Sequence, residues 1–306
     1  MSSIYDMIVL GGGPAGYTAA LYAARAGFSA LVIERMAPGG QMTQTELIEN
    51  FPGFEQGIDG FTLGEKMQKT AERFGVMTVY AEITEARLKG EIKRVATSMG
   101  EYLGKTAVIA TGAGPKSLGI PGEAELWGRG VHTCAHCDGR FYRGRRVAVV
   151  GGGNSAAADA LYLSRLAERV TVIHRRDTLR AEKASREPLL RAENVEFLWN
   201  TEPLSFQKSE SGITVSLKDV SGGNARERTF DGVFVSIGRR PATDLFREEL
   251  LLDGEGYIVA DESTRTGLPG VYAVGDVREK PLRQIVTAVG DGAVAAHFAE
   301  EYLSRL

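Results

Sequence analysis

Two cysteines stand close together in the segment VHTCAHCDG, and they are the only cysteines of the chain. Cys134 and Cys137 are separated by two residues, and Asp138 follows the second cysteine directly. Sulfur atoms at this spacing can close a small ring reversibly, which is the chemistry of a redox disulfide. A neighbouring carboxyl group can supply the proton that a departing thiolate needs, and burial would raise its pKa for that task. We therefore interpret Cys134, Cys137 and Asp138 as candidate catalytic residues.

Other interpretations of this segment were weighed against the redox disulfide. A zinc site normally needs four ligands, often two pairs, and this chain offers one pair. His136 lies inside the same turn as both cysteines, so four ligands from this segment could hardly close one tetrahedron, and we expect no metal. Asp138 could instead be a capping or turn residue. His132 and His136 could favour the thiolate when protonated, or could be half-exposed turn histidines without such a role.

A second kind of chemistry is indicated by two glycine-rich segments that repeat. Residues 9–35 and 149–175 align without a gap at an offset of 140 residues. Each copy has the pattern strand, glycine turn, helix, strand, which is typical of a dinucleotide-binding unit. The first glycine permits the tight turn, the second lets a pyrophosphate touch the backbone, and the third position packs helix on strand. The predicted cofactor-binding residues of the two turns are Gly11, Gly13 and Gly16 in one copy and Gly151, Gly153, Asn154 and Ser155 in the other.

The two copies differ where cofactor specificity is set. Glu34 ends the second strand of the first copy, and a carboxylate there accepts hydrogen bonds from ribose hydroxyls and repels an added phosphate. His174 takes the equivalent position in the second copy, and Arg175, Arg176 and Arg180 follow it. A guanidinium cluster in place of the acid fits a ribose with a 2′-phosphate, which predicts NADPH. The other adenine dinucleotide should then be a flavin, FAD, because two nicotinamides have no chemistry to do with each other.

These segments also predict the elements that position them. We expect strands at 4–10, 30–34, 146–150 and 170–174, helices at 18–26 and 156–166, and a C-terminal strand and long helix at 271–274 and 285–303. The segments TGAGPKSLGIPG and SIGRRPAT are rich in glycine and proline and are typical of domain crossings. The predicted fold class is α/β with two Rossmann-like domains. Residues 1–115 and 241–306 would form a discontinuous FAD-binding domain, and 116–240 an inserted NADPH-binding domain that carries the cysteine pair.

Composition narrows the class of protein. The chain has 306 residues, of which 43% are hydrophobic and 25% charged, with a formal net charge of −3. It lacks the basic excess of a nucleic-acid surface and any apolar run long enough to span a membrane. The start, MSSIYDMIVLGGG, has neither the basic residues nor the cleavage site of a signal peptide. We therefore expect a cytoplasmic protein, in which a close cysteine pair indicates a metal-binding or catalytic site rather than a lasting structural disulfide.

Taken in order and spacing, the motifs resemble those of the low-molecular-weight thioredoxin reductases over essentially the whole chain. They are GGGPAG, GGQM, ENFPGF, ATGA, CAHCDG, GGGNSA, HRRDTLR, GVYAVGD and RQIVTAVGDG. The resemblance implies a homodimer in which NADPH reduces FAD, the flavin reduces the Cys134–Cys137 disulfide, and the dithiol reduces thioredoxin. It implies that Cys137 lies nearer the flavin, that Cys134 attacks the thioredoxin disulfide, and that the middle domain rotates between two states. It adds four FAD-lining residues, which are Gln41, Asn50, Asp276 and Gln284.

The chain departs from the family pattern at three places. His136 stands where threonine is usual, Ala242 where asparagine is usual, and Ala158-Asp159 where two acids are usual. Alternatives to the main reading are a related flavoprotein disulfide reductase that uses ferredoxin or another donor, or one that reduces a thioredoxin-like partner other than thioredoxin. The reductase half of a hydroperoxide system and a flavin-bound redox sensor are further alternatives that fit the sequence less well.

Overall fold

The computed structural model describes residues 4–45 and 47–306, and the chain divides into two compact units. The first unit runs to Gly114 and resumes at Arg240, and the second is the intervening segment Pro115–Arg239. Both boundaries lie one residue before the domain boundaries expected from the sequence, which followed residues 115 and 240. The crossings fall in two short strands, β7 (Ala113–Pro115) and β16 (Arg239–Pro241), which pair with each other as a two-stranded sheet.

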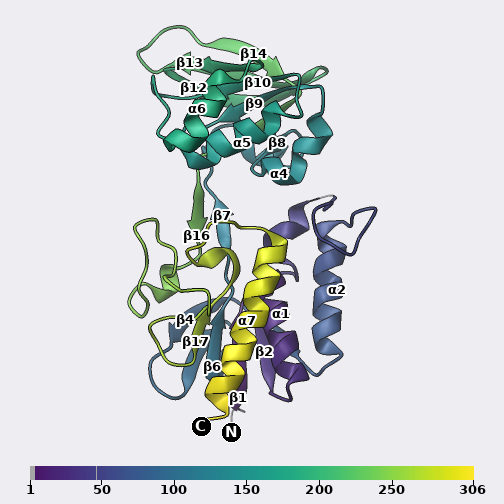
Figure 1. The fold of residues 1–306 in the computed structure, drawn as a ribbon, viewed down its shortest axis with the longest axis vertical. Coiled ribbons are helices and arrows are strands. Elements are labelled where there is room, and N and C mark those ends of the chain that lie inside the picture. The colour runs from purple at the N-terminus through teal and green to yellow at the C-terminus, as the bar shows by residue number, and fades with distance from the viewer. Residues whose placement is uncertain (1–3, 46) are drawn as a thin grey trace. The chain divides into compact units, whose positions relative to one another are not determined.

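The first unit is built on a seven-stranded sheet in the order β3-β2-β1-β6-β5-β4, with β17 added beside β6 (Figure 1). Strands β3, β2, β1, β6 and β17 are parallel, whereas β5 and β4 are antiparallel to their neighbours. The long β6 is shared along one edge, because β5 pairs with its first half and β17 with its last residues. The strands are β1 (Ile4–Leu10), β2 (Ala30–Glu34), β3 (Met77–Tyr80), β4 (Ile83–Arg87), β5 (Lys93–Thr97), β6 (Gly100–Ile109) and β17 (Val271–Ala273).

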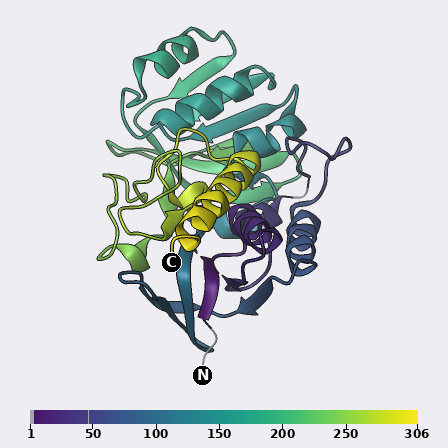
Figure 2. The ribbon, with the colours of Figure 1, turned by 60° about the horizontal axis from the view of Figure 1, so that its bottom comes forward.

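Both faces of this sheet are buried, as the continuous apolar run of β1 requires. Met7 and Val9 point into a core shared with the alanines of α1 and α7, and Ile8 and Leu10 point into a second core on the other face. Helices α1 and α7 lie side by side (Figures 1 and 2), and Gly292 permits this approach, since a Cβ there would lie 2.3 Å from the Ala15 carbonyl oxygen. The helices are α1 (Pro14–Arg25), α2 (Gly60–Glu72) and α7 (Ile285–Leu303), with 3-10 turns η1 (Gly40–Gln44), η3 (Asp244–Phe246) and η4 (Gly275–Val277).

The second unit has a similar architecture with a smaller central sheet. Its five-stranded sheet is parallel throughout, in the order β11-β10-β9-β15-β8, and a three-stranded antiparallel sheet accompanies it. Val147 and Val149 of β9 pack against α5, whereas Ala148 and Val150 pack toward the antiparallel sheet. The elements are α3 (Glu123–Leu126), β8 (Val131–His132), α4 (Ala135–Asp138), η2 (Gly139–Tyr142), β9 (Arg146–Val150), α5 (Asn154–Ser164), β10 (Arg169–Ile173), α6 (Lys183–Arg191), β11 (Val195–Leu198), β12 (Thr201–Ser209), β13 (Gly212–Asp219), β14 (Arg226–Phe230) and β15 (Gly232–Val235).

The α/β class and the two strand–turn–helix–strand copies predicted from the sequence are confirmed. The predicted helix starts, 18 and 156, were four and two residues too late, because α1 begins at Pro14 and α5 at Asn154, directly after the glycine turns. Proline is favoured at the first helical position, and asparagine tolerates the first turn, so the helices start earlier than their alanine-rich stretches indicate. The long C-terminal helix was predicted at the bounds that α7 has.

Candidate active site

The two cysteines form a disulfide at the start of the short helix α4 of the second unit. Cys134 and Cys137 have Cα atoms 5.3 Å apart. The backbone N–H groups of Cys137 and Asp138 both donate to the Cys134 carbonyl, at 3.3 and 3.1 Å, so one turn of helix sets the spacing of the sulfur atoms. Both cysteines are partly exposed, whereas Ala135 is buried beneath them. The pair is therefore held on a packed support and stays accessible.

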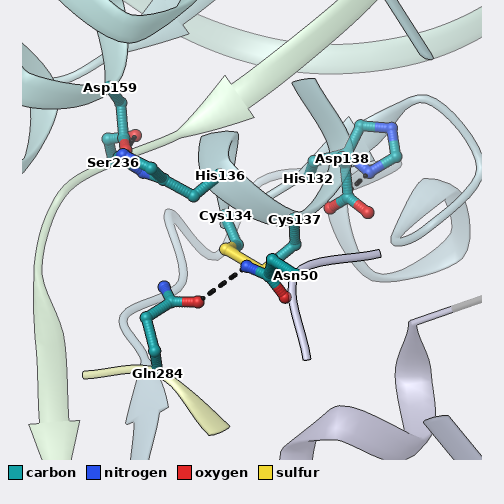
Figure 3. Close-up of a disulfide and its surroundings, with 9 residues drawn as sticks. All are labelled: Asn50, His132, Cys134, His136, Cys137, Asp138, Asp159, Ser236 and Gln284. Carbon is teal, nitrogen blue, oxygen red and sulfur yellow. Dashed lines mark hydrogen bonds and ion pairs between the residues drawn. A yellow bond between two sulfur atoms is a disulfide. The ribbon is translucent and has the colours of Figure 1, made fainter. Parts of the chain in front are cut away.

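Asp138 is the N-cap residue of η2, although its side chain makes no capping hydrogen bond. Its carboxylate contacts the imidazole of His132 instead, with 3.2 Å between Oδ2 and Nδ1, as the dashed line in Figure 3 shows. The capping or turn position that the sequence left open for Asp138 is therefore seen in the backbone, while the carboxylate stays available for other contacts. His132 is not the half-exposed turn residue considered above, since it lies on β8 and is only 8% exposed.

His136, between the two cysteines, faces a different carboxylate. Its side chain is about half exposed, stacks on Tyr162 of α5 with ring centroids 4.3 Å apart, and places Nδ1 4.0 Å from Oδ1 of Asp159. The Ser236 hydroxyl donates to Asp159 at 2.6 Å (Figure 3). Burial raises the pKa of the Asp159 carboxyl, against the opposing effects of the Ser236 hydrogen bond and of His136. Of the two acids that are usual here in the family pattern, the second is thus present as Asp159, whereas Ala158 replaces the first.

The glycine turn of the first unit has the geometry that a pyrophosphate needs. Gly11 has a φ of +111° at the end of β1, where a side chain would strike the Ala110 carbonyl. At Gly13, by contrast, no atom lies within 4 Å of where a Cβ would stand. The second glycine of the turn therefore faces open space at the N-terminus of α1, where backbone N–H groups and the helix dipole favour an anion.

The turn of the second unit matches it position by position. Gly151 has a φ of +147°, and a Cβ there would lie 2.3 Å from the Ser236 carbonyl oxygen, whereas Gly153 again faces open space. Ser155 is exposed in the first turn of α5. The side chain of Asn154 accepts a hydrogen bond from the Glu182 N–H at 2.8 Å and donates one to the Glu182 carboxylate at 3.2 Å. These bonds hold the segment that follows β10 next to the glycine turn.

The residues expected at the ribose ends, Glu34 and His174, lie against the middle glycine of each Gly-Gly-Gly run, which is Gly12 in one unit and Gly152 in the other. Glu34 accepts from the Gly12 N–H at 2.7 Å and from the Met36 N–H at 3.0 Å, and each carboxylate oxygen keeps a further lone pair for a ribose hydroxyl. In the other unit a Cβ at Gly152 would strike the ring of His174. The predicted equivalence of Glu34 and His174 is therefore seen in their positions.

Positive charge surrounds His174. The exposed residues Arg175 and Arg176 follow it directly, and the Arg180 N–H donates to the Gly152 carbonyl at 2.7 Å, which brings the exposed Arg180 back to the turn. Burial lowers the pKa of His174, and the neighbouring arginines lower it further, against the opposing effect of a backbone hydrogen bond with Thr178. Among the described residues, its buried Nε2 has no hydrogen-bond partner. The cluster supplies three cationic groups to an anion at this end of the turn.

The other predicted residues of the first unit gather around two loops. The Asn50 amide donates to Gln284 Oε1 at 3.0 Å (Figure 3), and Gln41 donates to the Ala113 carbonyl. Gln284 caps α7 in a reciprocal capping box with Thr287. Asp276 lies in η4, between β17 and α7. Residues far apart in the sequence are thus joined within one unit, although these contacts by themselves do not specify a ligand.

Sequence reasoning missed the partners of the polar groups around the disulfide. Tyr142 and Ser236 were not singled out, and His132 was considered only as a neighbour of Cys134. Since β8 is two residues long and pairs with β15 from 100 residues later in the chain, no local pattern could predict where the His132 ring points. The described part of the chain holds no group of three or more His, Cys, Asp or Glu side chains placed to bind a metal. Nor does any helix in residues 4–45 and 47–306 have the length and apolar character of a membrane span.

Comparison with known proteins gives one consistent result. The family model described as pyridine nucleotide-disulphide oxidoreductase matches residues 5–292. A thioredoxin reductase of Treponema pallidum is 44% identical over all of this chain and 99% of its own length, and one of Bacillus subtilis is 45% identical over 99% of this chain and 96% of its own length. The crystal structure of thioredoxin reductase from Streptococcus pyogenes is 43% identical, covers 100% of both chains and superposes with a TM-score of 0.93.

Proposed function

The chain belongs to the pyridine nucleotide-disulphide oxidoreductase family, and on that premise we propose that it is an NADPH-dependent thioredoxin reductase that works through the Cys134–Cys137 disulfide. The observation that carries the proposal is the presence, in one chain, of two open glycine turns and a partly exposed disulfide. Full-length relatives named thioredoxin reductase supply the substrate, the disulfide of thioredoxin.

Membership of the family implies a flavin and a pyridine nucleotide, and the residues present fit both groups. The first unit, with its open Gly13 and the Glu34 carboxylate, fits FAD, whose ribose carries no added phosphate. The second unit, with its open Gly153 and the cluster Arg175, Arg176 and Arg180, fits NADPH. We therefore assign FAD to the unit that contains both chain termini and NADPH to the inserted unit. When bound, these groups supply hydride transfer and a two-electron route to a disulfide.

The cysteine pair performs the protein's own covalent chemistry. Two electrons break the Sγ–Sγ bond and leave two sulfurs, one of which takes a proton from Asp138. The Cys134 thiolate then attacks the thioredoxin disulfide, forms a mixed disulfide and expels one thioredoxin thiolate. Cys137 next attacks the Cys134 sulfur, which restores the internal disulfide and releases the second thiol of thioredoxin. Every bond broken in this cycle is replaced, so the pair returns to its starting state.

The proposal extends to the arrangement of the chain. The inserted unit is joined to the rest through the paired strands β7 and β16, which are the natural hinges for a rotation that lets the pair meet first its reductant and then thioredoxin. We also propose a homodimer and a cytoplasmic location. Sedimentation equilibrium of the purified protein tests the dimer, since a monomer mass at micromolar concentration would contradict it.

The function is tested by following NADPH oxidation by the flavin-loaded protein with and without thioredoxin, with Cys137→Ser as the control. We expect turnover that depends on thioredoxin and is lost in the variant. If NADPH reduces the flavin but no thioredoxin is turned over, the partner is wrong and another thioredoxin-like protein must be sought. If NADPH does not reduce the flavin, the assignment of Arg175, Arg176 and Arg180 fails and a ferredoxin donor becomes the leading idea.

A further inference from the structure

A chain of three polar side chains begins at the residue that follows the disulfide. The Asp138 carboxylate contacts Nδ1 of His132 at 3.2 Å, and Nε2 of the same ring lies 2.7 Å from the Tyr142 hydroxyl. The three residues come from three successive elements, α4, β8 and η2. Both ring nitrogens of His132 are therefore occupied, one by an acid and one by a hydroxyl, so the ring can pass a proton toward the acid.

The His132 ring is held in one place. It is 8% exposed and stacks at 5.3 Å on Phe234, its partner in the β8–β15 ladder, and the Tyr142 ring meets both at 5.3 and 5.5 Å. Tyr142 is fixed in turn, since its ring fills the space over Gly232, where any Cβ would lie 2.3 Å from it. A ring packed in this way cannot turn Nδ1 away from Asp138 without breaking an aromatic cluster.

Tyr142 controls which ring nitrogen carries the proton. Burial, with the nearby Asp138 and Asp231, raises the pKa of Tyr142 to about 12, so it remains a hydroxyl at any working pH. It donates to Nε2 of a neutral imidazole, which places the ring proton on Nδ1, toward Asp138. It accepts from Nε2 when the ring becomes an imidazolium, because a hydroxyl can serve either way. The arrangement thus suits both protonation states of His132.

We propose that His132 and Asp138 act as one proton-holding pair for the redox disulfide, with Tyr142 as the residue that positions His132; this rests on the function proposed above. During reduction two electrons enter the disulfide, the Sγ–Sγ bond breaks, and one of the two sulfurs takes a proton from the protonated pair. The pair is then deprotonated. Before attack on the partner's disulfide it takes that proton back from the thiol, which leaves the nucleophilic thiolate and restores the protonated pair. Asp138 is the catalytic residue of this step, and His132 and Tyr142 act through it.

The titratable and charged groups near the His132 ring lie on the elements that pack around it. Asp138 of α4 and Tyr142 of η2 contact its ring, and β15 contributes the uncharged Phe234. His136, also on α4, stacks on Tyr162 and faces Asp159 instead. Asp231, just before β15, helps to raise the pKa of Tyr142 and forms ion pairs with Arg145 and Arg146. The remaining charged groups on η2 and at the start of β9 are Arg140, Arg143, Arg145 and Arg146, of which Arg145 and Arg146 pair with Asp231.

The experiment measures proton transfer at the pair directly and needs no turnover. The flavin-loaded full-length protein is reduced with dithiothreitol, freed of it, and alkylated with iodoacetamide over a range of pH. The variants are His132→Asn, which keeps an N–H donor but cannot titrate, and Tyr142→Phe, which removes one oxygen atom. We expect His132→Asn to lose one inflection of the pH profile and to react roughly tenfold more slowly at about pH 6.5, the effect of a thiol pKa raised by about one unit. Tyr142→Phe should shift the profile in the same direction by less.

His297→Asn is the matched control, since this histidine is exposed on α7 and its Nε2 lies 3.6 Å from the Glu301 carboxylate on the same helix. Its profile should superimpose on that of the parent protein. The proposal is overturned if His132→Asn and Tyr142→Phe also superimpose, or if all three variants shift alike. Should His132→Asn fail to fold, Tyr142→Phe decides alone. Because the readout uses neither NADPH nor thioredoxin, a failed turnover assay would reject the proposed function without touching this result.

Discussion

Two polar side chains of the cysteine segment each contact a titratable side chain, one within the segment and one outside it. Asp138 reaches His132 on β8, whereas His136 reaches Asp159 on α5. The cysteines, Asp138 and both histidines could be named from the sequence, because CxxC spacing is a local signal. Their partners could not, since Ser236 and Tyr142 are brought to the site by sheet pairing and by packing over Gly232. Local spacing thus indicates the candidate reactive residues, whereas the side chains that contact them depend on the tertiary structure.

At the arginine cluster the account predicts a change of cofactor preference. Replacing both Arg175 and Arg180 with alanine removes two of the three exposed arginines that follow His174. We expect the KM for NADPH to rise by about 10- to 100-fold, which corresponds to about 1.4–2.8 kcal/mol. The KM for NADH should stay the same, because NADH has no 2′-phosphate. Steady-state kinetics with both nucleotides measures the effect.

Arg191→Ala provides the comparison, since this exposed arginine ends α6 and pairs with Glu187 on the same helix. It should leave both constants unchanged. Equal losses for NADPH and NADH in the double variant would show that these arginines do not read the 2′-phosphate.

At the level of elements, two copies of one strand–turn–helix–strand unit account for most of what the sequence could predict. The offset of 140 residues places Gly12 and Glu34 where Gly152 and His174 stand, and the structure sets each pair in contact. The starts of α1 and α5 were predicted too late, because the first helical turn contains few strong helix-forming residues. The glycine turn before each helix determines where the helix begins. The pairing of β5 and β17 along one edge of β6 has no local signal, since strand order depends on contacts distant in sequence.

Two glycines of one turn should respond differently to the same substitution. A Cβ at Gly16 would lie 2.0 Å from the Gly11 carbonyl oxygen, so Gly16→Ala should destabilise the first unit by about 3 kcal/mol. A Cβ at Gly13 would have no atom within 4 Å among the described residues beyond its chain neighbours, so the thermal stability of Gly13→Ala without flavin should change by less than about 1 kcal/mol. It should instead weaken flavin binding by at least about tenfold, because the methyl group takes the space of the pyrophosphate. Thermal unfolding and flavin titration separate the two effects, and tight flavin binding by Gly13→Ala would refute the phosphate position.

Helix α7 carries a buried carboxylate whose loss should be costly. Asp291 accepts from Arg278 at 2.9 and 3.0 Å, from Lys280 at 2.7 Å and from the Gly275 N–H at 2.8 Å, and all three charged groups are buried. Burial acts to raise the pKa of Asp291, but the hydrogen bonds from Arg278 and Lys280 outweigh it and lower the pKa below its ordinary value of 3.8. Asp291→Asn removes the carboxylate that the buried Arg278 and Lys280 both contact, and it should cost about 3–5 kcal/mol near neutral pH.

The sign of the pH dependence follows from the direction of that shift. A carboxyl whose folded-state pKa is depressed stabilises the fold above its unfolded pKa, and the contribution is lost as the pH falls through the folded value. The difference in melting temperature between the parent protein and Asp291→Asn should therefore be largest near neutral pH and shrink below about pH 3.8. Asp244→Asn is the control, an exposed carboxylate between Arg240 and Arg247, with an expected cost below about 1 kcal/mol. A gap that widens on acidification would contradict this account of Asp291.

For the whole molecule, the sequence indicated an inserted unit because the second glycine turn lies between two glycine- and proline-rich segments. The chain divides at Gly114 and Arg240, and the two crossing strands β7 and β16 pair with each other. That pairing joins residues more than 120 positions apart, so composition could indicate the crossings but not their contact. Each unit keeps its own buried core, which allows one to bind a flavin and the other a nicotinamide without sharing a sheet.

The most direct measurement counts the thiols that NADPH creates. The flavin-loaded protein is mixed anaerobically with NADPH and quenched with iodoacetamide, and the alkylated cysteines are located by mass spectrometry. The account predicts alkylation of both Cys134 and Cys137 after NADPH and of neither without it. If NADPH is oxidised while both cysteines remain joined as a disulfide, electrons do not pass through the pair and the central claim is wrong.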